Sequence, residues 1–76
     1  MDVSLDGPAL HKAVNKARWE RRLIWREVAE QVGVHPRVVS ELRHGRNPSA
    51  TNLLKILVWL GATDVEAFIE VYEEAA

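Results

Sequence analysis

The chain has 76 residues, of which 47% are hydrophobic, and a formal net charge of −1. The length fits one small domain, the apolar content is too high for a disordered chain, and the absence of cysteine excludes disulfides and thiolate metal sites. The longest apolar run, LLKILVWLG, contains Lys55 and is far shorter than the roughly 20 residues that cross a bilayer, so no membrane segment is expected.

The spacing of apolar residues predicts five short helices and an all-α fold, because no segment alternates polar and apolar residues at length. The first helix is expected over about 8–22, with Pro8 near its start, where a missing backbone N–H costs nothing. The second is expected over 25–32. Gly33 follows and ends it, because glycine reaches a positive φ without a steric penalty.

Proline and serine mark where the next two helices begin. The third helix is expected over 36–44, with Pro36 at its first position, and the fourth over 49–60, with Ser49 as its cap. The fifth is expected over 64–74, and Thr63 and Glu66, at capping-box spacing, mark its start. Its apolar face consists of Val65, Phe68, Ile69 and Tyr72.

The short turn between the second and third helices is typical of a helix-turn-helix. The third helix has an apolar inner side formed by Val38, Val39 and Leu42. Its outer side carries Arg37, Ser40, Glu41 and His44. Such a helix can insert its polar side into the DNA major groove, about 12 Å wide. We therefore expect residues 1–76 to form a single helix-turn-helix DNA-binding domain.

Positive charge is concentrated in the middle of the chain. Residues 11–55 contain all ten Lys and Arg and four acids, a balance of +6, whereas the remaining residues have a balance of −7. This asymmetry favours a polyanionic partner, although a dipolar globule without such a partner has the same pattern.

The run ARWERRLIWREVAEQVGVHPRVVSELRHGRNPS resembles the lambda-repressor/Cro-like helix-turn-helix family, of the xenobiotic-response-element type. The elements in register are Val28-Ala29, Gly33-Val34, Val39-Ser40, Gly45 and Asn47-Pro48-Ser49. The likeness extends from residue 9 to about residue 70. It implies a sequence-specific regulator of transcription that binds double-stranded DNA as a homodimer, a repressor of the phage repressor or Cro type.

The resemblance places the base-reading positions on Pro36, Arg37 and Glu41, with Ser40 beside them. Pro36 can offer only an apolar contact, for instance to a thymine methyl. Arg37 can form two hydrogen bonds with guanine, and Glu41 can accept one from cytosine. Since Arg37 and Glu41 are four residues apart on a helix, a solvated ion pair is the alternative interpretation.

Contacts with the DNA backbone are expected from Trp25, Arg26, His35, Arg43, His44, Arg46 and Asn47. Ordinary surface charge is the alternative for the cations. Trp25 stands where the family often has a phosphate-binding glutamine, so its indole N–H could donate to a phosphate. The alternative is that Trp25 packs against Ile24 and the turn. His35 precedes the third helix, where local capping is equally expected. Arg43 replaces a glutamate that pairs with an arginine, here Arg18, so these two arginines are expected to repel each other.

The fourth helix has more apolar residues than one buried face needs. Leu54, Val58, Trp59 and, on the fifth helix, Val71 are therefore expected to form a homodimer interface. Packing within the chain is one alternative. A protein-interaction module, such as an antitoxin or adaptor that uses this face, is another.

No catalytic or metal-binding cluster is recognisable in the sequence. The three histidines lack the spacing of a zinc motif, and no nucleophile stands with a base. We expect a protein that is not an enzyme and uses no metal, cofactor or small-molecule ligand. A cytoplasmic, nucleoid-associated location is expected for a DNA-binding protein of this kind.

Overall fold

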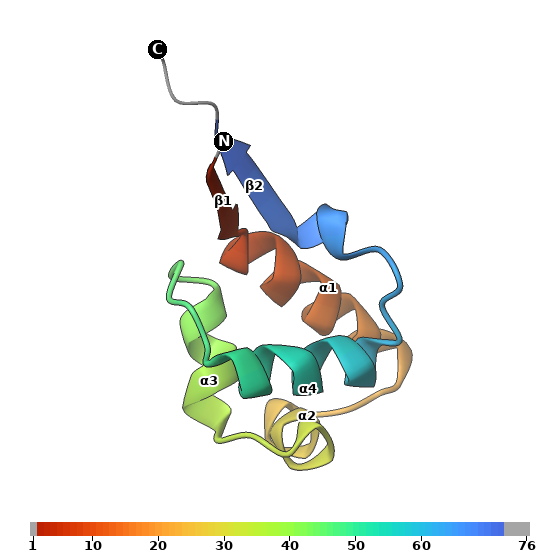
Figure 1. Ribbon diagram of the computed structural model, residues 1–76. Coiled ribbons are helices and arrows are strands. Elements are labelled where there is room, and N and C mark those ends of the chain that lie inside the picture. The colour runs from red at the N-terminus through yellow and green to blue at the C-terminus, as the bar shows by residue number, and fades with distance from the viewer. Residues whose placement is uncertain (1, 73–76) are drawn as a thin grey trace.

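The computed structural model describes residues 2–72, and this part of the chain is mostly helical. Its elements in chain order are β1 (Asp2–Leu5), α1 (Gly7–Glu20), α2 (Trp25–Val32), α3 (Pro36–Leu42), α4 (Ala50–Leu60), the 3₁₀ helix η1 (Val65–Phe68) and β2 (Ile69–Tyr72). The helices form one body, and the two strands project from it beside the start of α1 (Figure 1).

The ends of the helices follow from local chemistry. Ser49 Oγ accepts a hydrogen bond from Asn52 N at 3.1 Å, which confirms the predicted cap of α4. Gly33 ends α2 with φ +85°, as predicted. Asp6 caps α1 by accepting from Ala9 N at 3.1 Å, a role the sequence did not predict. Helices α1 and α3 each end two residues earlier than predicted.

The predicted fifth helix is wrong over the described residues 64–72, and its last two residues, 73 and 74, lie outside them. After η1 the chain forms β2, which pairs antiparallel with β1, so that Leu5 lies opposite Ile69 and Ser4 opposite Glu70. Asp6 N also donates to Phe68 O at 2.7 Å and thereby extends the connection to η1. The backbone N–H and C=O groups of this segment are thus satisfied by a distant strand, and the fold is all-α with a small strand pair added.

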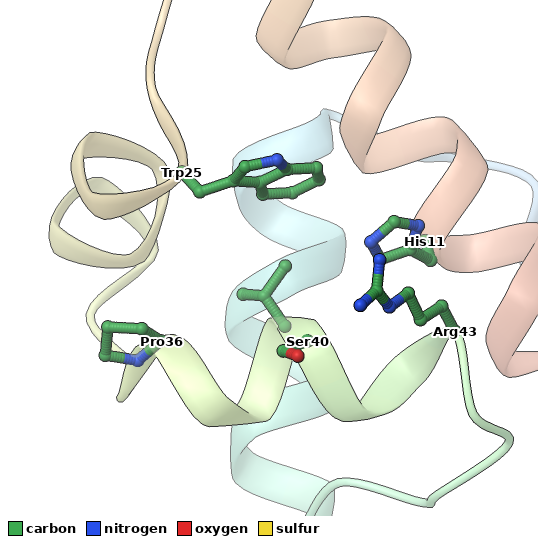
Figure 2. A pocket seen from close by; sticks show the side chains of 6 residues that line it. His11, Trp25, Pro36, Ser40 and Arg43 are labelled. Carbon is green, nitrogen blue, oxygen red and sulfur yellow. The ribbon is translucent and has the colours of Figure 1, made fainter.

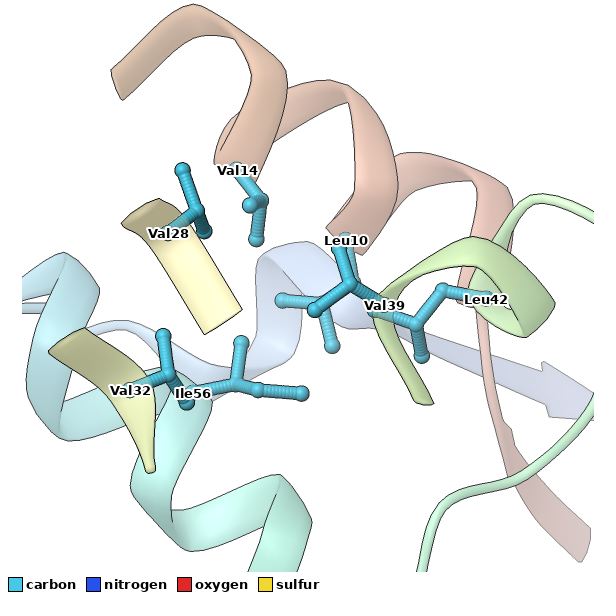
Figure 3. Close-up of a cluster of buried hydrophobic side chains, with 7 residues drawn as sticks. All are labelled: Leu10, Val14, Val28, Val32, Val39, Leu42 and Ile56. Carbon is cyan, nitrogen blue, oxygen red and sulfur yellow. The ribbon is translucent and has the colours of Figure 1, made fainter. Parts of the chain in front are cut away.

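All four α-helices contribute to one hydrophobic core (Figure 3). Its buried residues are Leu10, Val14, Val28, Ala29, Val32, Val39, Leu42 and Ile56. Leu5 and Phe68, near the strand pair, pack against this core and are partly buried. The inner stripe predicted for the helix-turn-helix is therefore the part of the core that seats α2 and α3.

Gly7 brings the start of α1 very close to the end of α3. A Cβ atom placed on Gly7 lies 2.5 Å from the carbonyl oxygen of Leu42. Because real Cβ atoms do not approach backbone so closely, only glycine fits here. This close approach sets His11, one turn further along α1, beside the residues that follow α3.

Among the described residues, no helix is both long enough and apolar enough to cross a membrane.

Candidate nucleic-acid interface

The turn between α2 and α3 is held by backbone and side-chain hydrogen bonds. Ala29 O accepts from Gly33 N at 2.9 Å and from Val34 N at 3.1 Å. Gly33 O in turn accepts from the Lys55 ammonium at 3.1 Å, which ties the turn to α4. The orientation of α3 is therefore fixed both by its own turn and by a third helix.

His35 caps α3 at the end of this turn. Its Nδ1 accepts from Arg37 N at 3.1 Å, so the local capping role considered for His35 is present. Because Nδ1 serves as the acceptor, the proton of the neutral ring lies on Nε2. Nε2 thus remains a donor that can point at a phosphate oxygen from the exposed start of α3.

Helix α3 separates its buried and exposed residues as the sequence predicts. Val39 and Leu42 are 3% and 0% exposed, and Val38 is partly buried. Pro36, Arg37 and Ser40 are exposed, and within residues 2–72 the Arg37 guanidinium has no hydrogen-bond or ion-pair partner. The side of α3 that carries these residues is not covered by the described part of the chain.

Glu41 is half-buried and less accessible than the other predicted base-reading residues. Its backbone carbonyl accepts from His44 N at 3.1 Å and Arg46 N at 3.2 Å, which shapes the turn after α3. The solvated Arg37–Glu41 pair considered from the sequence is not formed in the described residues.

Four exposed polar residues follow α3 in a tight turn around Gly45, whose φ is +77°. They are Arg43, His44, Arg46 and Asn47. Arg43 Nε lies 3.4 Å from His44 Nε2, so the first two are in contact. We call the exposed residues Pro36, Arg37 and Ser40 of α3, together with these four, the reading face.

Trp25, at the start of α2, packs on α1. Its ring stacks on His11 with centroids 5.1 Å apart, and the Arg18 guanidinium lies 4.8 Å from its centroid. The indole N–H has no acceptor among residues 2–72. Trp25 thus joins α1 to the reading face and leaves a donor exposed there, while Arg26 beside it is also exposed.

Arg18 avoids the predicted repulsion with Arg43 by binding neutral groups. Its Nε and Nη2 donate to Asn15 Oδ1 at 3.0 and 2.9 Å, and its Nη1 donates to Leu23 O at 3.1 Å. No acid is needed to hold it. Arg43 is left exposed on the reading face.

A pocket of about 310 Å³ lies between α1, α2 and α3. Figure 2 shows Trp25 and Pro36 on one side of it and the side chains of His11 and Arg43 close together at the other end, with Ser40 between on α3. The buried Val39 completes the lining. The lining is therefore apolar at Trp25, Pro36 and Val39 and polar at His11, Arg43 and Ser40.

The sequence did not identify His11 as a residue of this site. Burial lowers the pKa of His11 below its ordinary value of 6.5, and the nearby Arg43 and His44 lower it further. His11 lies seven residues before Arg18, hence on the same side of α1, but its contact with Trp25 depends on how α1 and α2 pack. That packing has no signature in the local sequence.

A second exposed surface, which we call the apolar face, lies on α4 beside α2. Leu54 is 61% exposed and Val58 is 80% exposed. A shallow groove of about 360 Å³ runs past both and along Val32 and Trp59. Trp59 is partly buried, and its indole N–H donates to Gln31 Oε1 at 3.0 Å, so it packs largely within the chain. The side chain of Val71 lies outside the described residues.

Two helices joined by a fixed turn, with a cationic exposed face on the second, define a helix-turn-helix DNA-binding domain. A family model described as Helix-turn-helix matches residues 15–66. The chain belongs to this family, of the Cro/C1 and xenobiotic-response-element type, which confirms the resemblance seen in the sequence. The family is one of DNA-binding regulators. Comparison with curated proteins and with solved structures finds no match.

Proposed function

We propose that the protein is a sequence-specific regulator of transcription that reads the DNA major groove with α3 and acts as a repressor. The observation that carries the proposal is the uncovered outer side of α3, where Arg37 has no partner among the described residues. A guanidinium left free on a helix seated by Val39 and Leu42 can reach base edges without first breaking a contact.

Within this proposal, base reading falls to Pro36, Arg37, Ser40 and Glu41. Arg37 is expected to contribute most to sequence specificity, since a bidentate contact with guanine is worth about 1–3 kcal/mol of discrimination between bases. Glu41 contributes less than its spacing suggests, because it is half-buried. Backbone contacts, which position the protein without reading sequence, fall to Trp25, Arg26, His35, Arg43, His44, Arg46 and Asn47.

A homodimer completes the proposal. Leu54 and Val58 are more exposed than residues of their type usually are, and water is excluded from them when a second copy covers the apolar face. Two copies can then place two α3 helices in successive major grooves, about 34 Å apart. Bound over a promoter, such a dimer excludes RNA polymerase, which is the mechanism of repression that we infer.

Selection of bound fragments from a random-duplex pool tests the proposal and yields the operator. Fluorescence anisotropy with that operator, at two salt concentrations, then compares three variants. We expect Arg37→Ala to relax the preference at one base pair, and Arg46→Ala to weaken binding to all duplexes alike and to lower the salt slope by about one. Lys16→Ala, an exposed cation of α1, is the control and should change neither.

A selection that enriches no sequence, with an affinity insensitive to salt, contradicts the proposal. The exposed apolar face would then favour the other candidate, a module that binds another protein. Light scattering coupled to gel filtration separates the two uses of that face: a dimer that Val58→Asp converts to a monomer supports self-association, whereas a wild-type monomer at all concentrations supports a different protein partner.

A further inference from the structure

The pocket beneath Trp25 adjoins the reading face and has two chemically different sides. Trp25, Pro36 and Val39 form its apolar side. His11, Arg43 and the Ser40 hydroxyl form its polar end, which includes no acidic residue. A ligand that fits has an apolar ring next to a negative charge. A DNA strand offers this combination at every step, as a deoxyribose joined to a phosphodiester.

We propose that this pocket seats one phosphodiester of the bound DNA with its deoxyribose, and that His11, in its protonated form, is one of the groups that hold the phosphate. The inference rests on the proposed function and adds a contact from α1, outside the helix-turn-helix itself. It makes the affinity for DNA depend on pH through one identified residue.

The position of His11 supports a role as a phosphate ligand. The ring stacks on Trp25, which holds its plane, and its free edge lies beside the Arg43 side chain at the polar end of the pocket (Figure 2). Gly7 keeps α1 close to the end of α3, so His11 and Arg43 are held together by the packing of the backbone. A phosphate between two such cations accepts hydrogen bonds from both.

In the free protein the neighbours of His11 oppose its protonation. From the end of α3 it faces Arg43 and His44. The guanidinium of Arg18, on α1 itself, lies 4.8 Å from the centroid of the Trp25 ring on which His11 stacks. The pKa of His11 is lowered by burial, then by Arg43 and then by His44. The side chain is therefore mostly neutral at pH 7 before DNA binds.

A bound phosphate reverses this balance. Its negative charge offsets Arg43 and favours the imidazolium, so the pKa of His11 rises on binding and the complex takes up a proton. By linkage, the affinity for DNA increases as the pH falls from the pKa in the complex to the lower pKa in the free protein. Uptake of one whole proton corresponds to about a tenfold change in affinity per pH unit.

The direct test follows the His11 ring by NMR during a pH titration of the wild-type protein, alone and saturated with its selected duplex. We expect the pKa of His11 to rise on addition of the duplex. Inorganic phosphate alone, at millimolar concentration, should leave it unchanged. A rise with inorganic phosphate alone identifies a free-anion site, and an unchanged pKa in a protein that binds duplex removes His11 from the DNA contact; either result overturns the proposal.

Variants give a second, independent measurement of the same proton. We expect the slope of log affinity against pH between 8 and 5.5 to fall by up to about one in His11→Gln. In His44→Gln, a neighbour that does not line the pocket, the pKa of His11 should still rise with duplex. If His11→Gln weakens binding by one factor at every pH, His11 has only a structural role. If no duplex binds the wild-type protein, the proposed function fails together with this inference.

Discussion

The reading face and the apolar face are built on the same core but present opposite chemistry. On α3, the exposed Arg37 and Ser40 stand over the buried Val39 and Leu42. On α4, the exposed Leu54 and Val58 flank the buried Ile56. The first surface exposes charged and hydrogen-bonding groups, among them the Arg37 guanidinium, which has no partner among the described residues. The second surface exposes aliphatic side chains to water. The comparison supports the proposals that α3 binds DNA and that α4 binds an apolar partner.

Each of these two helices has few buried residues. Only Ile56 is fully buried among the residues of α4, and only Val39 and Leu42 among those of α3. The remaining side chains of both helices are partly or fully accessible, although several of them still pack against the core, namely Val38, Leu53, Leu57, Trp59 and Leu60. Ile56 and Val58 are both aliphatic and stand two positions apart. Even so, Ile56 belongs to the core and Val58 to the apolar face.

The largest expected effect comes from truncating Ile56, and the matched truncation of Val58 should have almost none. Ile56→Ala should lower the free energy of unfolding by about 2–5 kcal/mol, because it removes buried methyl and methylene groups and leaves a cavity. Val58→Ala should change it by no more than about 0.5 kcal/mol, since Val58 is 80% exposed. Urea denaturation at low protein concentration measures both.

Raising the protein concentration sharpens this comparison. If a second copy covers the apolar face, the stability of the wild type should increase with concentration, and that of Val58→Ala should increase less. Equal losses for Ile56→Ala and Val58→Ala at low concentration would show that Val58 is buried within the single chain, contrary to the structure.

A smaller loss is expected for Gly7→Ala, which tests how α1 is joined to the reading face. The added Cβ meets Leu42 O at 2.5 Å, so the end of α3 must shift, at a cost of about 1–3 kcal/mol. Helix propensity alone acts in the other direction, since alanine is favoured over glycine by about 0.5–1 kcal/mol. Thermal unfolding followed by circular dichroism decides between the two effects. A lower melting temperature means that the clash with Leu42 dominates, and a higher one means that helix propensity dominates.

Lys12→Ala, an exposed change on the same helix, serves as the control for Gly7→Ala and should be nearly neutral. A more stable Gly7→Ala protein would mean that α1 and α3 are further apart than the structure shows. The contact of His11 with Arg43 would then lose its structural basis as well.

The sequence predicts α2, its turn and α3 well because their signals are local. Gly33 ends one helix, Pro36 begins the next, and the apolar residues within the two helices repeat at helical spacing. The fifth helix fails for a physical reason. The apolar residues Val65, Phe68, Ile69 and Tyr72 have helical spacing. The strand that begins at Ile69 has only four residues, however, so a short alternation of apolar and polar residues is enough for it. The choice depends on Asp2–Leu5, more than 60 residues away, which local pattern cannot reveal.

The candidate site also has a part that the sequence predicts and a part that it does not. Exposure of Arg37, Ser40 and Arg46 follows from their place on or after a helix whose inner side is known. The stack of His11, Trp25 and Arg18 depends on the packing of α1 against α2, and the departure from the family's glutamine at Trp25 gave no indication of its new partner. Residue type and helical spacing thus predict which side chains face outward. They do not predict which distant side chains meet.

The smallest expected effect concerns the stability of the free protein at mildly acidic pH, and it arises from His11, beside the reading face. The pKa of His11 is lower in the folded protein than its ordinary value of 6.5, through burial, Arg43 and His44. Between those two pKa values the unfolded chain binds more protons at this residue, so folding is disfavoured there. The contribution of His11 to stability is therefore complete above about pH 6.5 and declines as the pH falls towards the folded-state pKa. Urea denaturation at pH 7.5 and 5.5, without DNA, should show a smaller loss at pH 5.5 for His11→Gln than for the wild type. An equal loss would assign the acid sensitivity to other groups.

DNA is expected to raise the pKa of His11, so saturating duplex should abolish this part of the stability loss in the wild type. Val58→Ala, changed on the apolar face, serves as the control and should show the same pH dependence as the wild type.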